Sequence, residues 1–63
     1  MMRTEAEKLK AFRQERNLTQ QQFADLLDYK QTSIAMIETG KRNMPDSLKL
    51  KILRYFGVDF DEI

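Results

Sequence analysis

The sequence predicts an all-α fold, a bundle of five short helices. Apolar residues recur at the three- and four-residue spacing of helices that bury one face. Three capping-box patterns mark helix starts, at Thr4 and Glu7, Thr19 and Gln22, and Asp59 and Glu62. Two glycines, Gly40 and Gly57, stand where helices are expected to end. With 63 residues, the chain has room for one domain, residues 1–63, around one small core.

The first helix is expected to run from the Thr4 cap to about Arg16, with Asn17 ending it. Its apolar face is thin. Leu9 and Phe12 lie three residues apart and are its predicted core residues. Residues 1–3 are expected to fray or to form a short arm.

The second helix is expected to begin at Gln20, directly after the Thr19 cap. Leu18 before the cap and Phe23 in the helix form a hydrophobic staple, which fixes the angle at which the chain enters the helix. The apolar face of this helix comprises Phe23, Ala24 and Leu27.

The third helix follows a turn at residues 28–30. Ile34 and Ile37 define its apolar edge, and Gly40 is expected in the left-handed conformation that caps a helix C-terminus. The opposite face lacks the lysines and glutamates of an ordinary solvated helix. It carries small or uncharged side chains, those of Gln31, Thr32, Ala35 and Met36. This composition favours a recognition surface.

The fourth helix is expected to begin near Pro45 and to run to about Tyr55, before the stop at Gly57. Its predicted buried stripe comprises Leu48, Ile52, Leu53 and Phe56. The box at Asp59 and Glu62, with Val58 and Ile63 as a second staple, predicts a fifth helix of one turn that packs on the core.

The composition narrows the function classes. The chain contains no cysteine and no histidine, so it has no thiolate metal site and lacks the commonest general base. Because it also lacks a glycine-rich phosphate loop and a carboxylate cluster, an enzyme is set aside, and no metal, cofactor or small-molecule ligand is expected. No segment approaches the roughly 20 apolar residues that span a bilayer, and a signal-peptide pattern is absent. A cytoplasmic protein without a membrane partner is therefore expected.

The formal net charge is only +1, but it is unevenly distributed. Residues 30–54 hold six basic and two acidic residues, whereas residues 1–29 are balanced and residues 55–63 are acidic. Positive charge therefore concentrates around and after the third helix, where phosphates would be met. For Lys49, Lys51 and Arg54, an ordinary solvated face is an open alternative.

One set of residues recurs at the spacing of a known two-helix motif and its flanking helices. The set comprises residues 18–20, Phe23, Ala24, Leu27, Ile34, Ile37, Glu38 and residues 40–42, and it continues at residues 56–58 and 61–63. Through them the sequence resembles the Cro/cI-type helix-turn-helix, the DNA-binding domain shared by lambda-like phage repressors, Cro proteins and many small bacterial regulators. The resemblance implies a five-helix bundle of the lambda-repressor-like type, with the helix-turn-helix at about residues 19–39. It also implies double-stranded DNA as the partner of a prokaryotic or phage-encoded, nucleoid-associated protein.

In helix-turn-helix proteins, the second helix of the motif lies in the major groove and its N-terminal residues reach base edges. The predicted base-contacting residues are Gln31, Thr32, Ala35 and Met36. Glutamine can bond to N6 and N7 of adenine, and the methyl groups of the other three suit the thymine methyl, so A·T steps are the expected preference. Met36 also fits a second interpretation, as part of an apolar patch for a protein partner.

The predicted phosphate-contacting residues are Gln20, Lys30, Ser33, Lys41, Arg42 and Asn43. At the first position of its helix, Gln20 has a backbone N–H that is free for a phosphate oxygen. The resemblance implies that its side chain also braces Gln31. For each of two residues an alternative stays open. Gln20 also fits an ordinary helix-forming surface residue, and Lys30 also fits a solvated turn residue.

The resemblance further implies a partly buried ion pair between Arg13 and Glu38, which would fix the direction of the recognition helix. Two departures from the family pattern affect the position of Gln31. Asp28 stands where the family usually has a left-handed glycine, and Lys30 stands where a serine or threonine usually caps the recognition helix.

The predicted function is a sequence-specific transcriptional regulator, a repressor that binds a near-palindromic operator as a homodimer. The C-terminal part, including Tyr55 and Phe60, is the candidate dimer surface, although both residues fit the core equally well. The alternative is a protein-interaction module, an antitoxin or accessory domain that keeps the helix-turn-helix scaffold. The near-neutral charge, Asp28 and Lys30 support this alternative.

Overall fold

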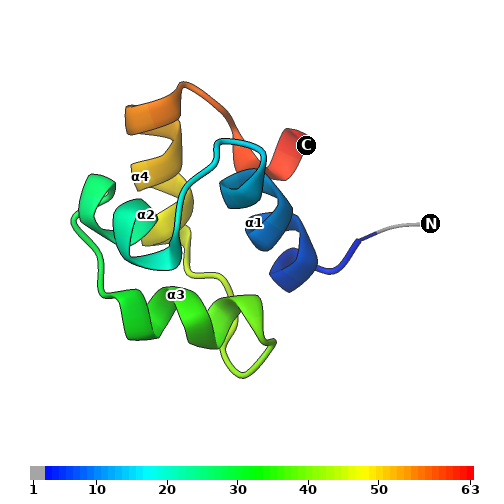
Figure 1. Ribbon diagram of the computed structural model, residues 1–63. Helices are drawn as coiled ribbons and strands as arrows, with labels where there is room; N and C mark the ends of the chain where they lie inside the picture. Colours follow the sequence, from blue (N-terminus) through cyan, green and yellow to red (C-terminus); the bar gives the residue numbers. More distant parts are fainter. Residues whose placement is uncertain (1–2) are drawn as a thin grey trace.

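The computed structural model describes residues 3–63, so that the first two residues of the expected N-terminal arm lie outside the described part. Within residues 3–63 the fold is all-helical and contains no strand. The elements are α1 (Glu5–Gln14), α2 (Gln20–Leu26), α3 (Gln31–Glu38), α4 (Asp46–Phe56) and η1 (Phe60–Glu62), arranged as in Figure 1. The predicted class is confirmed, but the count of five helices is not, because η1 is a single 3-10 turn.

The first two helices begin where the capping boxes predict. The Thr4 hydroxyl accepts a hydrogen bond from the Glu7 N–H at 3.1 Å, and the Glu7 carboxylate accepts one from the Thr4 N–H at 3.3 Å. The second box is equally complete, with distances of 3.1 and 2.9 Å between Thr19 and Gln22. Each box satisfies N–H groups that would otherwise lack a partner in the first turn.

The first helix ends two residues earlier than predicted, at Gln14. Asn17 adopts a left-handed conformation (φ 57°), which turns the chain back so that the Leu18 N–H faces the Arg13 carbonyl oxygen at 3.4 Å. Asparagine adopts this conformation at lower cost than most residues. Asn17 thus reverses the chain after α1, three residues beyond the last helical residue.

The turn between α2 and α3 depends on Asp28, which is left-handed with φ 51°. The Tyr29 N–H donates to the Ala24 carbonyl oxygen at 2.8 Å, and the Asp28 N–H donates to that of Asp25 at 3.2 Å. These two bonds form a Schellman motif in which aspartate takes the usual place of glycine. Lys30 then precedes α3 in an extended conformation and provides no side-chain cap.

The two glycines are both left-handed, with φ 78° at Gly40 and φ 71° at Gly57, as the sequence predicts. Gly57 is the C-terminal cap of α4. Pro45 is the N-terminal cap of α4 and not its first helical residue, and it offers no side-chain hydrogen bond to the helix.

The core lies between the helices and is rich in phenylalanine. The Phe12 ring lies 6.2 Å from that of Phe23, 5.2 Å from that of Phe56 and 6.5 Å from that of Phe60, measured between centroids. The buried apolar residues are Leu9, Phe12, Phe23, Ala24, Leu27, Ile34, Ile37, Met44, Leu48, Ile52 and Phe60. Leu18, Tyr29, Phe56 and Val58 pack against this cluster and are partly buried.

Two core assignments differ from the prediction. The sequence predicts Leu53 in the buried stripe of α4, but Leu53 is 43% exposed, because the inward face of this helix is occupied by Leu48 and Ile52. Met44 lies in the loop between α3 and α4, outside every predicted apolar stripe, yet its side chain is buried in the cluster.

The C-terminal turn also differs in detail. The Asp59 carboxylate accepts a hydrogen bond from the Asp61 N–H at 3.0 Å and not from that of Glu62, so the predicted capping box is wrong. Ile63 is exposed, so the predicted staple with Val58 is also wrong. Phe60 anchors the turn in the core and is fully buried, which removes it from the candidate dimer surface, whereas Tyr55 is exposed.

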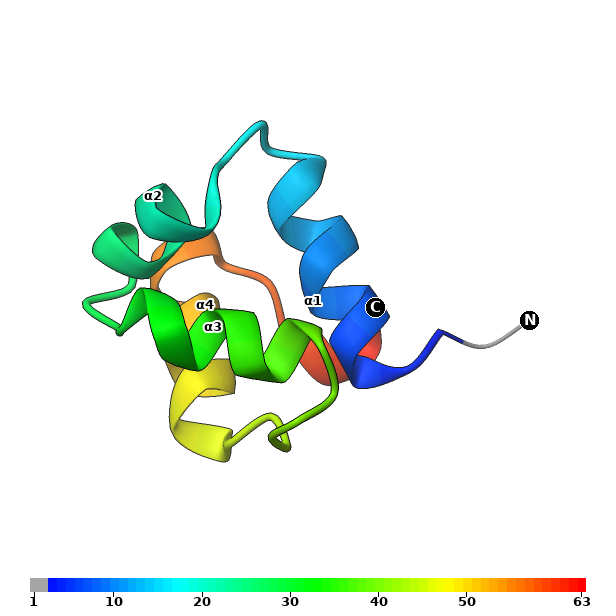
Figure 2. The same cartoon turned by 60° about the horizontal axis from the view of Figure 1, so that its bottom comes forward.

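The arrangement leaves one side of α3 uncovered. This helix packs against α1 and α2. Turning the molecule so that its lower side comes forward brings α3 to the front in Figure 2, with no other element across it. None of the helices in residues 3–63 is both long and apolar enough to cross a membrane.

Candidate nucleic-acid interface

The uncovered side of α3 carries the four predicted base-contacting residues. Ile34 and Ile37 face the core, and they hold the helix by its opposite side. Thr32 is exposed and Met36 is 42% exposed, while Gln31 and Ala35 are half-buried. These four side chains lie at helical spacings of one, four and five residues, so they share one face that the protein itself does not use for packing.

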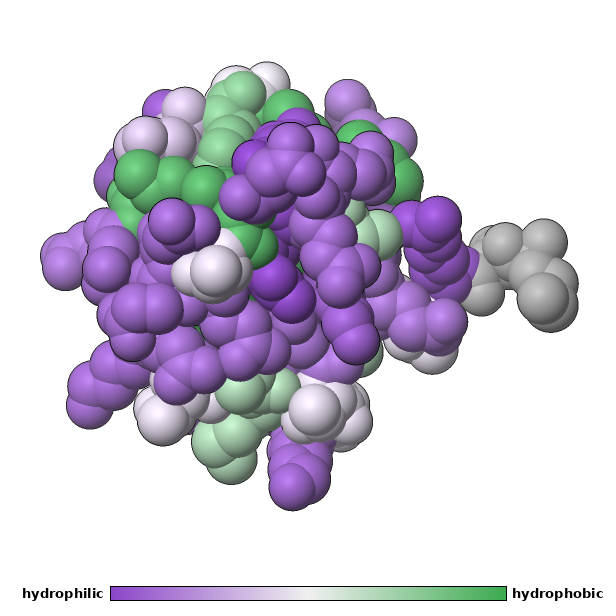
Figure 3. Space-filling model, in the orientation of Figure 1, coloured by the Kyte–Doolittle hydropathy of each residue, from purple (hydrophilic) through white to green (hydrophobic). Residues whose placement is uncertain are grey.

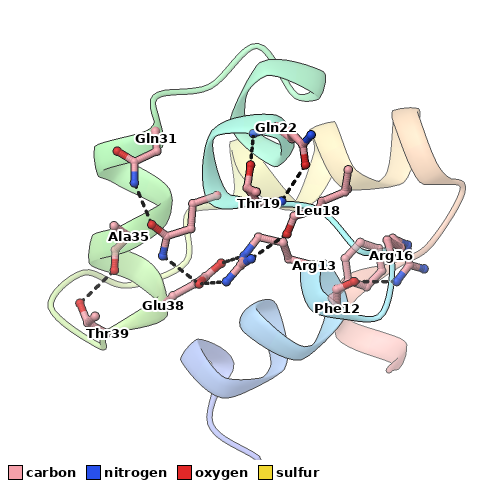
Figure 4. A network of polar contacts seen from close by, with 11 residues as sticks. Phe12, Arg13, Arg16, Leu18, Thr19, Gln22, Gln31, Ala35, Glu38 and Thr39 are labelled. Carbon is pink, nitrogen blue, oxygen red and sulfur yellow. Dashed lines mark hydrogen bonds and ion pairs between the residues drawn. The ribbon is translucent and has the colours of Figure 1, made fainter.

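The N-terminal part of this face is held by a chain of hydrogen bonds, shown in Figure 4. The Gln31 Nε2 donates to Gln20 Oε1 at 2.7 Å, and the Gln20 Nε2 donates to Glu38 Oε1 at 3.2 Å. These hydrogen bonds therefore link the first residue of α2 with both ends of α3. The family resemblance relates Gln20 to Gln31 and Arg13 to Glu38, but no sequence signal indicates the Gln20–Glu38 bond that joins the two pairs.

At its inner end, this series of hydrogen bonds meets a buried ion pair. Arg13 on α1 donates from Nε to Glu38 Oε2 at 2.8 Å and from Nη2 to Glu38 Oε1 at 3.0 Å. Both residues are only 8% exposed. The hydrogen bond to Glu38 raises the pKa of the Arg13 guanidinium above its ordinary value, against the opposing effect of burial.

Arg13 has a third anchor that sequence patterns do not reveal. Its Nη1 donates to the Leu18 carbonyl oxygen at 2.7 Å, so that the guanidinium binds the loop before α2 as well as α3. A backbone carbonyl carries no residue-specific signal, and only the folded chain brings it to the arginine. The single side chain thus ties together α1, the loop before α2 and α3.

The predicted phosphate-contacting residues after α3 are placed by a second Schellman motif. The Lys41 N–H donates to the Met36 carbonyl oxygen at 2.9 Å, and the Gly40 N–H donates to that of Ile37 at 3.1 Å. Arg42 folds back so that its Nη1 lies 3.3 Å from the Ser33 hydroxyl oxygen. Lys41, Arg42 and Asn43 are all exposed, directly beyond the helix end.

Exposed positive charge flanks α3 at both ends. Lys30 lies at its start, and Lys41 and Arg42 lie after its end; none of the three forms an ion pair within residues 3–63. Lys49, by contrast, contacts Glu5 at 3.2 Å and Asp61 at 2.8 Å. The hydrogen bond to Asp61 raises the pKa of Lys49, and its charge is balanced within the protein.

The dimensions of this face match double-stranded DNA. An α-helix such as α3 is about 10–12 Å in diameter with its side chains. The major groove of B-form DNA is also about 12 Å wide, with phosphates along both edges. An α-helix of this size therefore fits into the major groove.

Comparison with known proteins adds two findings. The sequence model of the helix-turn-helix family matches residues 9–63. Over 56 residues the chain is 39% identical to an uncharacterized HTH-type transcriptional regulator of Methanocaldococcus jannaschii, an alignment that covers 89% of this chain and 85% of that protein. No solved structure matches the chain significantly.

Proposed function

We propose, from the premise that this chain belongs to the helix-turn-helix family, that it is a sequence-specific DNA-binding regulator of transcription. The observation that carries the proposal is the outward face of α3, on which Thr32 and Met36 are exposed and which is flanked by cations that form no ion pair within residues 3–63. In this proposal α3 lies in the major groove and α2 crosses the phosphate backbone. Residues 1–63 act as one binding domain, without enzymatic activity.

The proposed base contacts follow from the chemistry of each side chain. Gln31 offers an amide whose N–H and oxygen match N7 and N6 of adenine. The methyl groups of Thr32, Ala35 and Met36 suit the thymine methyl. Gln20, Lys30, Ser33, Lys41, Arg42 and Asn43 are the proposed phosphate contacts, which set the position of α3 without distinguishing bases.

We further propose that the protein binds a near-palindromic operator as a homodimer and acts as a repressor. A domain of this size buries little DNA surface by itself, and two copies on half-sites one helical turn apart supply the rest. Tyr55 is exposed in the last turn of α4 and is the proposed centre of the dimer contact.

Replacing Gln31 with alanine tests the proposed base contact. After operator half-sites are selected from a random duplex pool, the Gln31→Ala variant is expected to lose about 1–3 kcal/mol of discrimination at one base position. Discrimination at the other positions is expected to persist. The measurement is the affinity for duplexes carrying each single base change.

The matched control is Gln21→Ala, which removes an exposed glutamine that bonds Asp25 within α2. This variant is expected to bind every duplex as the wild type does. Equal weakening on all duplexes by Gln31→Ala would contradict a base contact.

Neutralising Lys41 or Arg42 is expected to weaken binding alike on all sequences. Each phosphate contact releases counterions, so its loss should reduce the slope of log affinity against log salt by about 1. The control is Arg54→Gln, in the last turn of α4, which Figure 1 shows at the end of the molecule away from α3. If Arg54→Gln lowers the slope as much, the cations after α3 have no special role.

One observation favours the alternative, a protein-interaction module such as an antitoxin or accessory domain. In Figure 3 the strongest hydrophobic colours lie in the upper half of the molecule, and a paler hydrophobic patch lies at its lower edge. The exposed large apolar residues are Leu26, Met36, Leu50, Leu53, Tyr55 and Ile63. Binding to random duplex at low salt decides between the two functions. A dissociation constant weaker than about 10⁻⁴ M without a salt slope would favour the protein partner.

A further inference from the structure

The hydrogen bonds that reach Gln31 have a fixed direction. Glu38 accepts from Arg13 at both carboxylate oxygens and from Gln20 at one of them. A carboxylate that is paired with a guanidinium accepts hydrogen bonds and donates none, and a guanidinium only donates. The Glu38 carboxylate therefore accepts only a neighbour that turns an N–H group toward it.

This direction passes through Gln20. An amide can be placed in either of two orientations, with the oxygen and nitrogen exchanged. Only one of them points an N–H at Glu38, and it leaves the Gln20 oxygen facing Gln31. Gln31 must then donate to that oxygen, as it does at 2.7 Å.

The orientation of Gln20 decides which groups of the Gln31 amide stay free. With one N–H bonded to Gln20, the Gln31 amide keeps its other N–H and its oxygen for a ligand. A donor beside an acceptor complements N7 and N6 of adenine, whereas guanine presents two acceptors, N7 and O6. An amide turned the other way would bond Gln20 through its oxygen and keep both N–H groups, which suits guanine.

We propose that Glu38, acting through Gln20, is a positioning residue that sets the orientation of the Gln31 amide and thereby the preference for adenine over guanine. The inference rests on the proposed function. It gives the buried ion pair a role in base specificity in addition to its role in holding α1 against α3.

The test replaces the anchor without leaving a buried charge. The double variant Arg13→Met/Glu38→Leu substitutes an apolar pair of similar size, an exchange that folded proteins tolerate. The matched variant Gln20→Met removes the link and keeps the ion pair. Discrimination between adenine and guanine at the Gln31 position is about 5- to 150-fold for a bidentate contact. We expect it to fall by at least about fivefold in both variants.

A third variant reverses the direction. Gln20→Lys leaves the ion pair intact and offers only N–H donors to both Glu38 and Gln31. The Gln31 amide must then turn its oxygen inward, and the preference is expected to shift from adenine to guanine. Because each result is a ratio of affinities, the added charge cancels. An unchanged ratio in Gln20→Lys would overturn the proposal, and so would an unchanged ratio in the folded double variant.

A second readout needs no DNA. The Gln31 side-chain proton that bonds Gln20 is expected to show a small temperature coefficient by NMR. In the double variant Gln20 is present but no longer held in one orientation, so the coefficient should rise toward that of Gln14, which is exposed and has no side-chain hydrogen bond in the described chain. If the wild type selects no DNA sequence, the proposed function fails, while the amide signal still decides whether Glu38 orients Gln31. A coefficient that is the same in both proteins would overturn the positioning role.

Discussion

Phe23→Ala is expected to remove most of the stability of this domain. The Phe23 side chain is fully buried on α2, and its ring lies 6.2 Å from that of Phe12 and 6.0 Å from that of Phe56. Truncating a buried phenylalanine typically lowers the free energy of unfolding by about 3–5 kcal/mol, through lost burial and the cavity left behind. A chain of this length has roughly 3–9 kcal/mol in total.

Urea unfolding followed by circular dichroism measures the loss. The control is Leu53→Ala, at a position that the sequence assigns to the core and the structure exposes. Its effect is expected to lie within about 0.5 kcal/mol, as for surface substitutions. A loss at Leu53 as large as that at Phe23 would contradict the packing of α4 described above.

Glu38→Ala is expected to cost about 3–5 kcal/mol of unfolding free energy, because it leaves the Arg13 guanidinium buried without its anion. Replacing both partners together, as Arg13→Met/Glu38→Leu, is expected to be neutral or to stabilise the fold by about 1–4 kcal/mol. The same urea titration measures both. The contrast separates the cost of an unpaired buried charge from the net worth of the pair.

The matched control for the ion pair is Asp61→Ala. Asp61 also contacts a cation, Lys49 at 2.8 Å, but its side chain is largely exposed to water. Solvent screens such a pair, so the loss is expected to be much smaller than that of Glu38→Ala. Equal losses would show that burial does not distinguish the two ion pairs, and the anchoring role of Arg13 would then lack support.

Most of the secondary structure could be predicted from the sequence, because the signals are local. The boxes at Thr4 and Thr19 act over three residues, and the left-handed turns at Asp28, Gly40 and Gly57 depend on one residue each. Prediction failed where two local patterns competed. At the C-terminus, Asp59 could bond either of two nearby N–H groups, and it bonds that of Asp61.

The face of α3 could also be predicted, since helical spacing alone separates the Ile34 edge from the side that carries Thr32 and Met36. The sequence could not show that this side is left uncovered, because covering depends on where the other helices lie. Its contacts with bases and phosphates are still predictions, which the variants above test.

By itself the sequence determined the helical class, the starts and turns of the helices, most of the core and the family to which the chain belongs. Only the tertiary structure decided that Met44 is buried while Leu53 is exposed, and that Gln20 joins Gln31 to the Arg13–Glu38 pair. The physical reason is the sequence separation between the residues that interact. Caps and turns form between neighbours in the chain, whereas burial and the Gln20–Glu38 bond require elements that meet only when the whole chain has packed.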